Sequence, residues 1–234
     1  MAEGLAIVTG GSRGIGAAIA TALDAQGYDV VSVSRSGDTP AGHGIACDLT
    51  DETALKAAFS DIGAAGPVVA LVNNAGFHIT AKSAELERGD YEQVMALNAT
   101  AVMLASREAY PLLKQSGGTI VNIGSFFDRM GVPDNLAYCA SKAAVGAMTR
   151  CLAVEWAKDG IRVLNVAPGY IATDLNEDYL ARDKVKTWLA SRIPTGGPGT
   201  PQDVATLVTS LITGAIPYLT GETIYLDGGQ GMKH

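Results

Sequence analysis

Short apolar runs alternate along the chain with longer segments in which apolar residues recur every three or four positions. The apolar runs predict buried strands at residues 5–8, 30–33, 44–47, 68–72, 119–123, 161–166 and 223–226. The helical spacing predicts helices at residues 17–25, 52–59, 91–114 and 138–158. This alternation predicts one α/β domain over residues 1–234, with a doubly wound, seven-stranded parallel sheet in a three-layer α/β/α arrangement.

Two intervals depart from this alternation. Only residues 35–43 separate the second predicted strand from the third, which is too short for the usual crossover helix, so we expect a loop there. Residues 174–199 are rich in charge and then in proline and glycine, and they follow the sixth strand at the edge where such sheets bind ligands. We expect this interval to form a mobile substrate lid, with a static surface excursion as the alternative.

The composition excludes several classes of protein. Of the 234 residues 47% are hydrophobic, which is ample for a packed core and excludes a largely disordered chain. The formal net charge of −7 argues against nucleic-acid and anionic-membrane partners. Cys47, Cys139 and Cys151 are too widely spaced for a metal cluster or a disulfide framework, so we expect no metal and a reducing compartment. The pattern predicts neither a signal peptide nor a membrane span, and we therefore expect a cytoplasmic protein.

A glycine-rich turn at residues 9–16 connects the first predicted strand to the first predicted helix. Glycines let the backbone turn tightly and approach a pyrophosphate, while the helix N-terminus presents free N–H groups to that anion. This unit is typical of Rossmann-type dinucleotide-binding folds, although a tight turn without a ligand is the alternative. The residues expected to contact the cofactor here are Gly10, Ser12, Arg13, Gly14, Ile15 and Gly16.

The end of the second predicted strand indicates which dinucleotide is bound. An acidic residue at this place would accept from the ribose 2′-hydroxyl of NAD, but the chain has Ser34 and Arg35. Together with Arg13 in the glycine turn, Arg35 would suit a 2′-phosphate, so we expect NADP(H) to be preferred, with NAD(H) as the alternative. The competing interpretation is that either arginine is an ordinary solvated surface residue.

Candidate catalytic residues gather around the start of the helix predicted at residues 138–158. Tyr138 and Lys142 are four residues apart and share a helical face, where an ammonium group would lower the pKa of the phenol and create an acid/base group. Ser125 follows the fifth predicted strand and could donate to a carbonyl oxygen. Asn98 lies within the helix predicted at residues 91–114, either as a satisfied core amide or as a residue that holds a water in a proton relay.

With these motifs in this order, the chain resembles the compact, single-domain branch of the short-chain dehydrogenase/reductase family over essentially its whole length. The resemblance rests on residues 9–16, Asp48-Leu49, residues 73–76, Asn98, Ser125, residues 138–142, Pro168-Gly169 and Thr173.

The resemblance implies a role for each matching position. Tyr138 would be the general acid/base, Lys142 would lower its pKa and hold the nicotinamide ribose, Ser125 would orient the substrate, and Asn98 would anchor a water. Asp48 would contact the adenine. The other implied cofactor contacts are Leu49, Asn74, Ala75, Gly76, Pro168, Gly169, Ile171 and Thr173. Most relatives are tetramers packed through the two long helices, so the resemblance also implies a homotetramer.

The residues expected around the substrate are mostly aromatic. A wall of this kind accepts apolar or ring-shaped substrates. The candidates, besides Ser125, are His78, Phe126, Phe127, Tyr170, Leu175 and Trp188. Of the polar residues nearby, His78, Arg129 and Asn176 could read a carboxylate or hydroxyls. For His78 and Arg129, a plain surface role is the alternative.

We therefore expect an NADP(H)-dependent oxidoreductase that interconverts a ketone and a secondary alcohol, a small-molecule carbonyl or alcohol substrate being its partner. Residues 169–176 are similar both to gluconate-type sugar-acid dehydrogenases and to 3-oxoacyl reductases, and both substrate classes stay open. A non-catalytic NADP-binding sensor or scaffold is the alternative of another class, and the intact Asn98, Ser125, Tyr138 and Lys142 set argues against it. An epimerase or dehydratase is disfavoured, because those relatives usually carry larger C-terminal domains.

Overall fold

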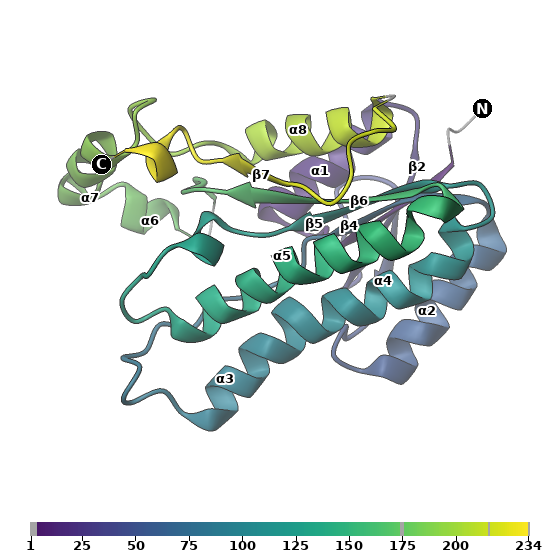
Figure 1. The fold of residues 1–234 in the computed structure, drawn as a ribbon, viewed down its shortest axis with the longest axis horizontal. Coiled ribbons are helices and arrows are strands. Elements are labelled where there is room, and N and C mark those ends of the chain that lie inside the picture. The colour runs from purple at the N-terminus through teal and green to yellow at the C-terminus, as the bar shows by residue number, and fades with distance from the viewer. Residues whose placement is uncertain (1–3, 174–175, 215, 234) are drawn as a thin grey trace.

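A twisted parallel sheet forms the centre of the computed structural model, which describes residues 4–173, 176–214 and 216–233 (Figure 1). In this part of the chain seven strands pair in the order β3-β2-β1-β4-β5-β6-β7, and every pairing is parallel. The strands are β1 (Leu5–Thr9), β2 (Asp29–Ser34), β3 (His43–Ala46), β4 (Val68–Asn73), β5 (Gly118–Ile123), β6 (Ile161–Pro168) and β7 (Thr223–Leu226). The predicted sheet and its doubly wound connectivity are confirmed.

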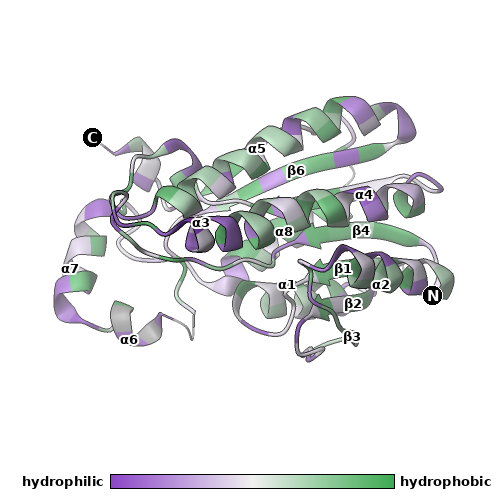
Figure 2. Ribbon diagram, turned by 90° about the horizontal axis from the view of Figure 1, so that it is seen from below, coloured by the Kyte–Doolittle hydropathy of each residue, from purple (hydrophilic) through white to green (hydrophobic). Residues whose placement is uncertain are grey.

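Helices cover both faces of this sheet, which gives the predicted three layers. On one face lie α1 (Gly14–Ala25) and α8 (Pro201–Thr213), which pack against each other. On the other lie α2 (Glu52–Ala65), α4 (Ala101–Leu113) and α5 (Leu136–Trp156). Each interface between layers buries its own apolar core, and Figure 2 shows the strands between them as mostly hydrophobic. The apolar runs of the strands are buried on both sides, as expected for a covered parallel sheet.

The long helix predicted at residues 91–114 is three elements. α3 (Arg88–Met95) is followed by a π-helical turn at Ala96–Thr100, and α4 continues the chain from Ala101. A π turn inserts one extra residue into the helical ladder, and such turns are frequent at functional sites. The second long helix, α5, begins at Leu136, two residues before the predicted start.

The link between β2 and β3 is a loop without a helix, as the short spacing predicts. Thr39 holds it in shape, because its hydroxyl donates to Ala41 O at 2.6 Å and accepts from the Ser32 hydroxyl at 2.9 Å. Gly37 and Gly42 have positive φ angles of 73° and 69°, a conformation that side chains disfavour. Because no helix covers it, most of β3 is exposed.

The segment after β6 contains two helices that the sequence pattern did not predict. They are α6 (Glu177–Leu180) and α7 (Asp183–Arg192), at the end of the molecule where the C-terminus also lies (Figure 1). Leu180, Leu189 and Ile193 form a small apolar core of their own, against which Tyr170 packs. Residues 174 and 175, at the start of the predicted lid, lie outside the described part of the chain.

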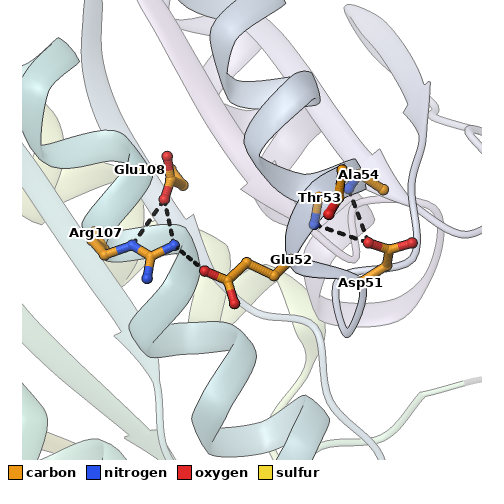
Figure 3. A network of polar contacts seen from close by, with 6 residues as sticks. All are labelled: Asp51, Glu52, Thr53, Ala54, Arg107 and Glu108. Carbon is orange, nitrogen blue, oxygen red and sulfur yellow. Dashed lines mark hydrogen bonds and ion pairs between the residues drawn. The ribbon is translucent and has the colours of Figure 1, made fainter.

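Charged side chains fasten α2 at its N-terminus, as Figure 3 shows. Asp51 caps the helix by accepting from the backbone N–H groups of Thr53 at 2.9 Å and Ala54 at 3.1 Å. Glu52 forms a 2.7 Å ion pair with Arg107 of α4, which joins the two helices. The N-terminus of α1 is different, because no side chain caps it. Its first N–H groups are therefore available to a ligand.

Across the described ranges 4–173, 176–214 and 216–233, no helix has both the length and the apolar character needed to cross a membrane.

Candidate active site

A row of polar side chains crosses the apolar sheet close to the carboxyl ends of its strands. Thr9, Asn73, Asn122, Asn165 and Thr223 are register partners on β1, β4, β5, β6 and β7 in turn. The three asparagines are buried, with at most 2% of their surface exposed. Close to this row the apolar strands end and the polar residues of the site begin.

Hydrogen bonds connect this polar row to the two long helices. Asn73 Nδ2 donates to Asn122 Oδ1 at 2.8 Å and to Ser106 of α4 at 3.0 Å. Asn122 Nδ2 donates to Thr149 of α5 at 2.9 Å. Asn122 and Asn165 are not among the predicted site residues, although each stands out in the sequence as an isolated amide within an apolar run.

The predicted Ser125, Tyr138 and Lys142 come together just beyond the end of β5. Ser125 begins the 3₁₀ helix Phe126–Arg129, and its hydroxyl interacts with the phenol of Tyr138. Lys142 is one turn further along α5, and its buried Nζ donates to Ile123 O at 2.8 Å. The ammonium lies 5.6 Å from the centre of the Tyr138 ring. A hydroxyl, a phenol and a cation are thus grouped where a substrate carbonyl could be held.

Burial dominates the protonation of this group. It raises the pKa of Tyr138 above the ordinary value of 10.0, and the hydrogen bond with Ser125 offsets part of the rise. Desolvation lowers the pKa of Lys142 from 10.5 to about 8. Lys142 is not among the groups that shift the pKa of Tyr138 here, and its ammonium donates to the carbonyl of Ile123.

Asn98 is fully buried within the π turn, and its amide binds protein groups on two sides. Its Oδ1 accepts from the N–H of Phe77 at 2.9 Å, and its Nδ2 donates to Phe77 O at 2.9 Å and to Ser141 Oγ at 3.2 Å. An ideal Cβ on Gly76 would lie 3.1 Å from Asn98 Oδ1 and 3.7 Å from Lys142 Nζ. Asn98 therefore braces the turn after β4 against α5, and both N–H donors of its amide are occupied.

The glycine turn before α1 forms a tightly packed cradle. Gly10 and Gly14 have positive φ angles of 69° and 56°. An ideal Cβ on Gly16 would lie only 2.1 Å from Gly10 O, so a side chain there would require the turn to open. Ser12 in this turn and Ile15 at the start of α1 are half-buried. The turn and the uncapped N-terminus of α1 together suit a pyrophosphate.

The turn after β4 supports that cradle from the side. Asn74 Nδ2 donates to Thr9 O at 3.1 Å and to Gly10 O at 3.0 Å, while Thr9 Oγ1 accepts from the N–H groups of Asn74 at 3.0 Å and Ala75 at 3.2 Å. In the structure the amide nitrogen of Asn74 thus positions the glycine turn itself. Leu49 is buried and lies close to Thr9 and Ala75.

Two exposed arginines flank the open end of the cradle, Arg13 before α1 and Arg35 after β2. Neither forms an ion pair within the described part of the chain, although the charge of Arg35 contributes to the lowered pKa of Asp48. The main causes of that lower pKa are the hydrogen bonds that Asp48 accepts from Thr50, at 2.9 Å from its N–H and 2.7 Å from its hydroxyl.

The segment after β6 reaches over to the glycine turn. Thr173 Cγ2 lies 3.8 Å from an ideal Cβ on Gly14. Ile171 is buried and bridges to Gly199, and Gly169, next to Pro168 at the end of β6, donates its N–H to Leu226 O at 2.9 Å. Asn176 fastens the turn by donating to Ile171 O at 2.9 Å and accepting from the N–H of Thr173 at 2.8 Å. These contacts occupy the side-chain amide of Asn176, a residue predicted to read a carboxylate or hydroxyls of the substrate.

Aromatic side chains predicted for the substrate wall form one continuous cluster. The centroid of the Tyr138 ring lies 4.7 Å from that of His78 and 6.0 Å from that of Phe127. Phe126 contacts Phe127 at 4.7 Å and Tyr170 at 5.5 Å. Trp188 of α7 lies 5.7 Å from Tyr170, which extends the cluster into the segment after β6. His78 also hydrogen-bonds Asn135, and the predicted Leu175 lies outside the described residues.

In residues 4–173, 176–214 and 216–233, no three potential metal-binding side chains of histidine, cysteine, aspartate or glutamate gather in one place. The groups that do gather at this edge of the sheet are hydroxyl, amide and ammonium groups together with the glycine cradle.

Comparison with known proteins agrees with this geometry. The family model described as Enoyl-(Acyl carrier protein) reductase matches residues 10–230. The 3-oxoacyl-[acyl-carrier-protein] reductase MabA of Mycobacterium tuberculosis is 36% identical over 231 residues, which cover 97% of this chain and 93% of that protein. Glucose 1-dehydrogenase of Gluconobacter oxydans is 36% identical over 239 residues, with 95% and 90% of the two chains covered.

Solved structures show the same relationship in three dimensions. The gluconate 5-dehydrogenase of Burkholderia cenocepacia, crystallised with NADP and tartrate, is 27% identical with a TM-score of 0.92, and the match covers 100% of this chain and 97% of that one. A short-chain type dehydrogenase/reductase from Mycobacterium marinum is 29% identical with a TM-score of 0.89, and covers 98% and 96% of the two chains. The chain belongs to the short-chain dehydrogenase/reductase family of oxidoreductases.

Proposed function

We propose that this oxidoreductase transfers hydride between NADP(H) and a substrate that alternates between a ketone and a secondary alcohol. The observation that carries the proposal is the contact between the hydroxyls of Ser125 and Tyr138, with the buried ammonium of Lys142 one helical turn away. This group can hold a carbonyl oxygen and exchange one proton with it. A sensor or scaffold would have no use for such a group.

The chain's own residues fit a dinucleotide phosphate. The cradle at Gly10, Gly14 and Gly16 and the uncapped start of α1 would hold the pyrophosphate. Arg13 and Arg35 would bind a 2′-phosphate, since both are exposed and neither has a carboxylate ion-pair partner within the described residues. Lys142 and the segment around Ile171 and Thr173 would hold the nicotinamide end. When bound, NADPH supplies the hydride.

During reduction, the Ser125 hydroxyl donates to the carbonyl oxygen and holds it beside Tyr138. The phenol of Tyr138 then gives its proton to that oxygen as negative charge develops there. Lys142, cationic below its pKa of about 8, stabilises the phenolate that remains. Asn98 keeps the turn after β4 in place against α5. Alcohol oxidation uses the same groups in reverse, with Tyr138 as the base.

Two substrate classes follow from the relatives. One resembles the 3-oxoacyl thioester substrate named for MabA, and the other the sugar acid named for gluconate 5-dehydrogenase. The aromatic cluster of Phe126, Phe127, Tyr170 and Trp188 suits the apolar face of either. We propose that residues 176–199 act as a lid over this cluster.

The test is loss of NADPH absorbance with a panel of keto sugar acids, 3-oxoacyl thioesters, and cyclic and aryl ketones. Tyr138→Phe removes the only atom that the proposal uses for proton transfer, so turnover should disappear while NADPH still binds in a fluorescence titration. Tyr218→Phe removes the same hydroxyl from a fully exposed tyrosine and is the matched control. Turnover retained by Tyr138→Phe would contradict the mechanism, and failure of NADPH to bind the unmodified protein would contradict the cofactor assignment.

We also propose a homotetramer that packs through α4 and α5. Met103 of α4 and Val154 of α5 are large apolar residues with 39% and 82% of their surface exposed. Sedimentation velocity of the protein and of Val154→Glu tests this assignment, because a buried charge at the interface should shift the tetramer toward smaller species.

A further inference from the structure

A network of contacts links the pocket wall to α7 through the C-terminal residues 227–233, here called the tail. Resting on the function proposed above, we propose that Arg129 and Asp227 are positioning residues for the substrate. They touch neither the reacting atoms nor the cofactor cradle. Their ion pair joins the 3₁₀ helix Phe126–Arg129, which carries the aromatic wall, to the tail, and the tail holds α7 in place.

The first link is between the 3₁₀ helix and the last strand. The Arg129 guanidinium lies flat on the Tyr225 ring, with Cζ 3.6 Å from the ring centroid. Its NH2 is 3.5 Å from Asp227 Oδ2. On the same helix, Asp128 Oδ1 accepts a 3.0 Å hydrogen bond from the Tyr225 hydroxyl. The Arg129 guanidinium therefore already contacts Tyr225 and Asp227. These contacts argue against the prediction that it reads a substrate carboxylate.

Asp227 is the centre of the second link, and only 7% of its side-chain surface is exposed. Its two oxygens accept from the N–H groups of Gly229 at 3.0 Å and Gly231 at 2.9 Å, which folds the tail into the short helix Gln230–Met232. The positive φ angles of Gly228 and Gly229, 62° and 83°, permit this turn. The same carboxylate thus shapes the tail and binds Arg129.

The third link joins the tail to α7. Lys233 Nζ donates to Ser191 O at 2.5 Å, and Thr195 donates its N–H to Gly228 O at 3.3 Å. An ideal Cβ on Gly228 would lie 2.6 Å from Ile193 Cγ2, so the tail packs closely on the end of α7. These contacts fix the C-terminal end of α7 from outside.

The last link returns to the pocket. Trp188 of α7 packs on Tyr170, and Tyr170 packs on both Phe126 and Phe127 of the 3₁₀ helix where the network began. The path is therefore closed, and α7 is held both by the tail and by the aromatic wall. Breaking the Arg129–Asp227 tie should loosen α7 and so weaken substrate binding, while Ser125, Tyr138 and Lys142 keep their places.

The experiment uses Trp188 as its reporter. Trp156 is the only other tryptophan, so Trp156→Phe leaves Trp188 as the single fluorophore. In that background Arg129→Met and Asp227→Asn should each make Trp188 more accessible to iodide or acrylamide quenching. With a turned-over substrate, KM should rise roughly tenfold, while kcat and the NADPH dissociation constant should stay within about twofold. Arg129→Lys should restore part of both effects.

The matched control is Arg88→Met, which removes the exposed ion pair between Arg88 and Glu92 on α3 and should change neither readout. The double variant Arg129→Met/Asp227→Asn should be little worse than either single variant, because both break the same tie. Unchanged quenching of Trp188 in both single variants would overturn the proposal, and so would a loss confined to kcat. The quenching requires no turnover, so it stays informative even if no ketone proves to be a substrate.

Discussion

The ammonium group of Lys142 donates a 2.8 Å hydrogen bond to the carbonyl oxygen of Ile123. The side chain is 5% exposed, and its donor is directed to the backbone end of β5. A single neutral acceptor does not replace the hydration of a cation, which is why the pKa of Lys142 falls to about 8. The site therefore maintains a charge that weakens the fold.

Replacing this charge should stabilise the protein. Between about pH 8 and 10.5, Lys142 is protonated in the unfolded chain and has lost its proton in the folded chain. The unfolding free energy therefore rises with pH in this window. Below pH 8 Lys142 is charged in both states, and the cost of burying that charge is greatest. Lys142→Met should therefore be more stable near neutral pH, by up to about 3 kcal/mol, and the difference should vanish toward pH 10.5. Urea denaturation of both proteins across this range measures it. A difference that does not depend on pH would show that the pKa is not lowered.

Removal of the Ser125 hydroxyl should change both rate and pH dependence. Ser125→Ala deletes a donor to the carbonyl oxygen, and kcat should fall about 100- to 1,000-fold. It also deletes the hydrogen bond that holds down the pKa of Tyr138, so the alkaline limb of the pH–rate profile for reduction should move to higher pH. Steady-state rates at a series of pH values test both effects. An unshifted alkaline limb would show that Tyr138 does not supply the titrating proton.

Arg35 should determine the choice of dinucleotide. Arg35→Asp replaces a cation beside the expected 2′-phosphate with an anion, so NADPH affinity should fall by about ten- to hundredfold and NADH affinity should not fall. Fluorescence titration with both cofactors measures this. The control is Lys158→Asp, which makes the same charge change just before β6, at the amino ends of the strands and away from the site at their carboxyl ends. Equal weakening of NADPH and NADH by Arg35→Asp would exclude phosphate recognition by Arg35.

Gly124 and Asn165 should behave as a coupled pair. An ideal Cβ on Gly124 would lie 2.6 Å from Asn165 Oδ1, so Gly124→Ala should cost about 1–3 kcal/mol of unfolding free energy. Asn165→Ala removes the amide that the new methyl group would meet. The double variant should therefore lose less unfolding free energy than the two single variants lose in sum. Chemical denaturation of the four proteins gives the coupling energy. Strict additivity would contradict the close contact.

Much of this architecture was predictable from local pattern. The seven apolar runs lie where the strands lie, and the spacing of Tyr138 and Lys142 placed both on one face of α5. The glycine turn before α1 was also predictable, because its backbone conformation favours glycine over other residues. The short interval after Arg35 correctly predicted a loop. Each of these features depends on residues that are close together in the chain.

The features that escaped prediction depend on distant partners. The π turn at Asn98 is stabilised by Phe77 and Ser141, 21 and 43 residues away. The helix α7 contains many charged residues, and its few apolar residues did not predict a helix. They are buried through contacts with residues outside the helix, among them Tyr170. The raised pKa of Tyr138 comes from burial, which no spacing encodes. These outcomes required the tertiary structure.

The row of amides at Asn73, Asn122 and Asn165 also limits how the sheet can assemble. Strands made of valine, leucine and isoleucine offer little to distinguish one alignment from its neighbours. A slip of one residue would turn an amide toward α1 and α8, where it would be buried among apolar side chains without its partners. Each such error would cost about 1–3 kcal/mol, so the row favours the native register over its neighbours. The loops that hold the site residues therefore begin at the same level along neighbouring strands.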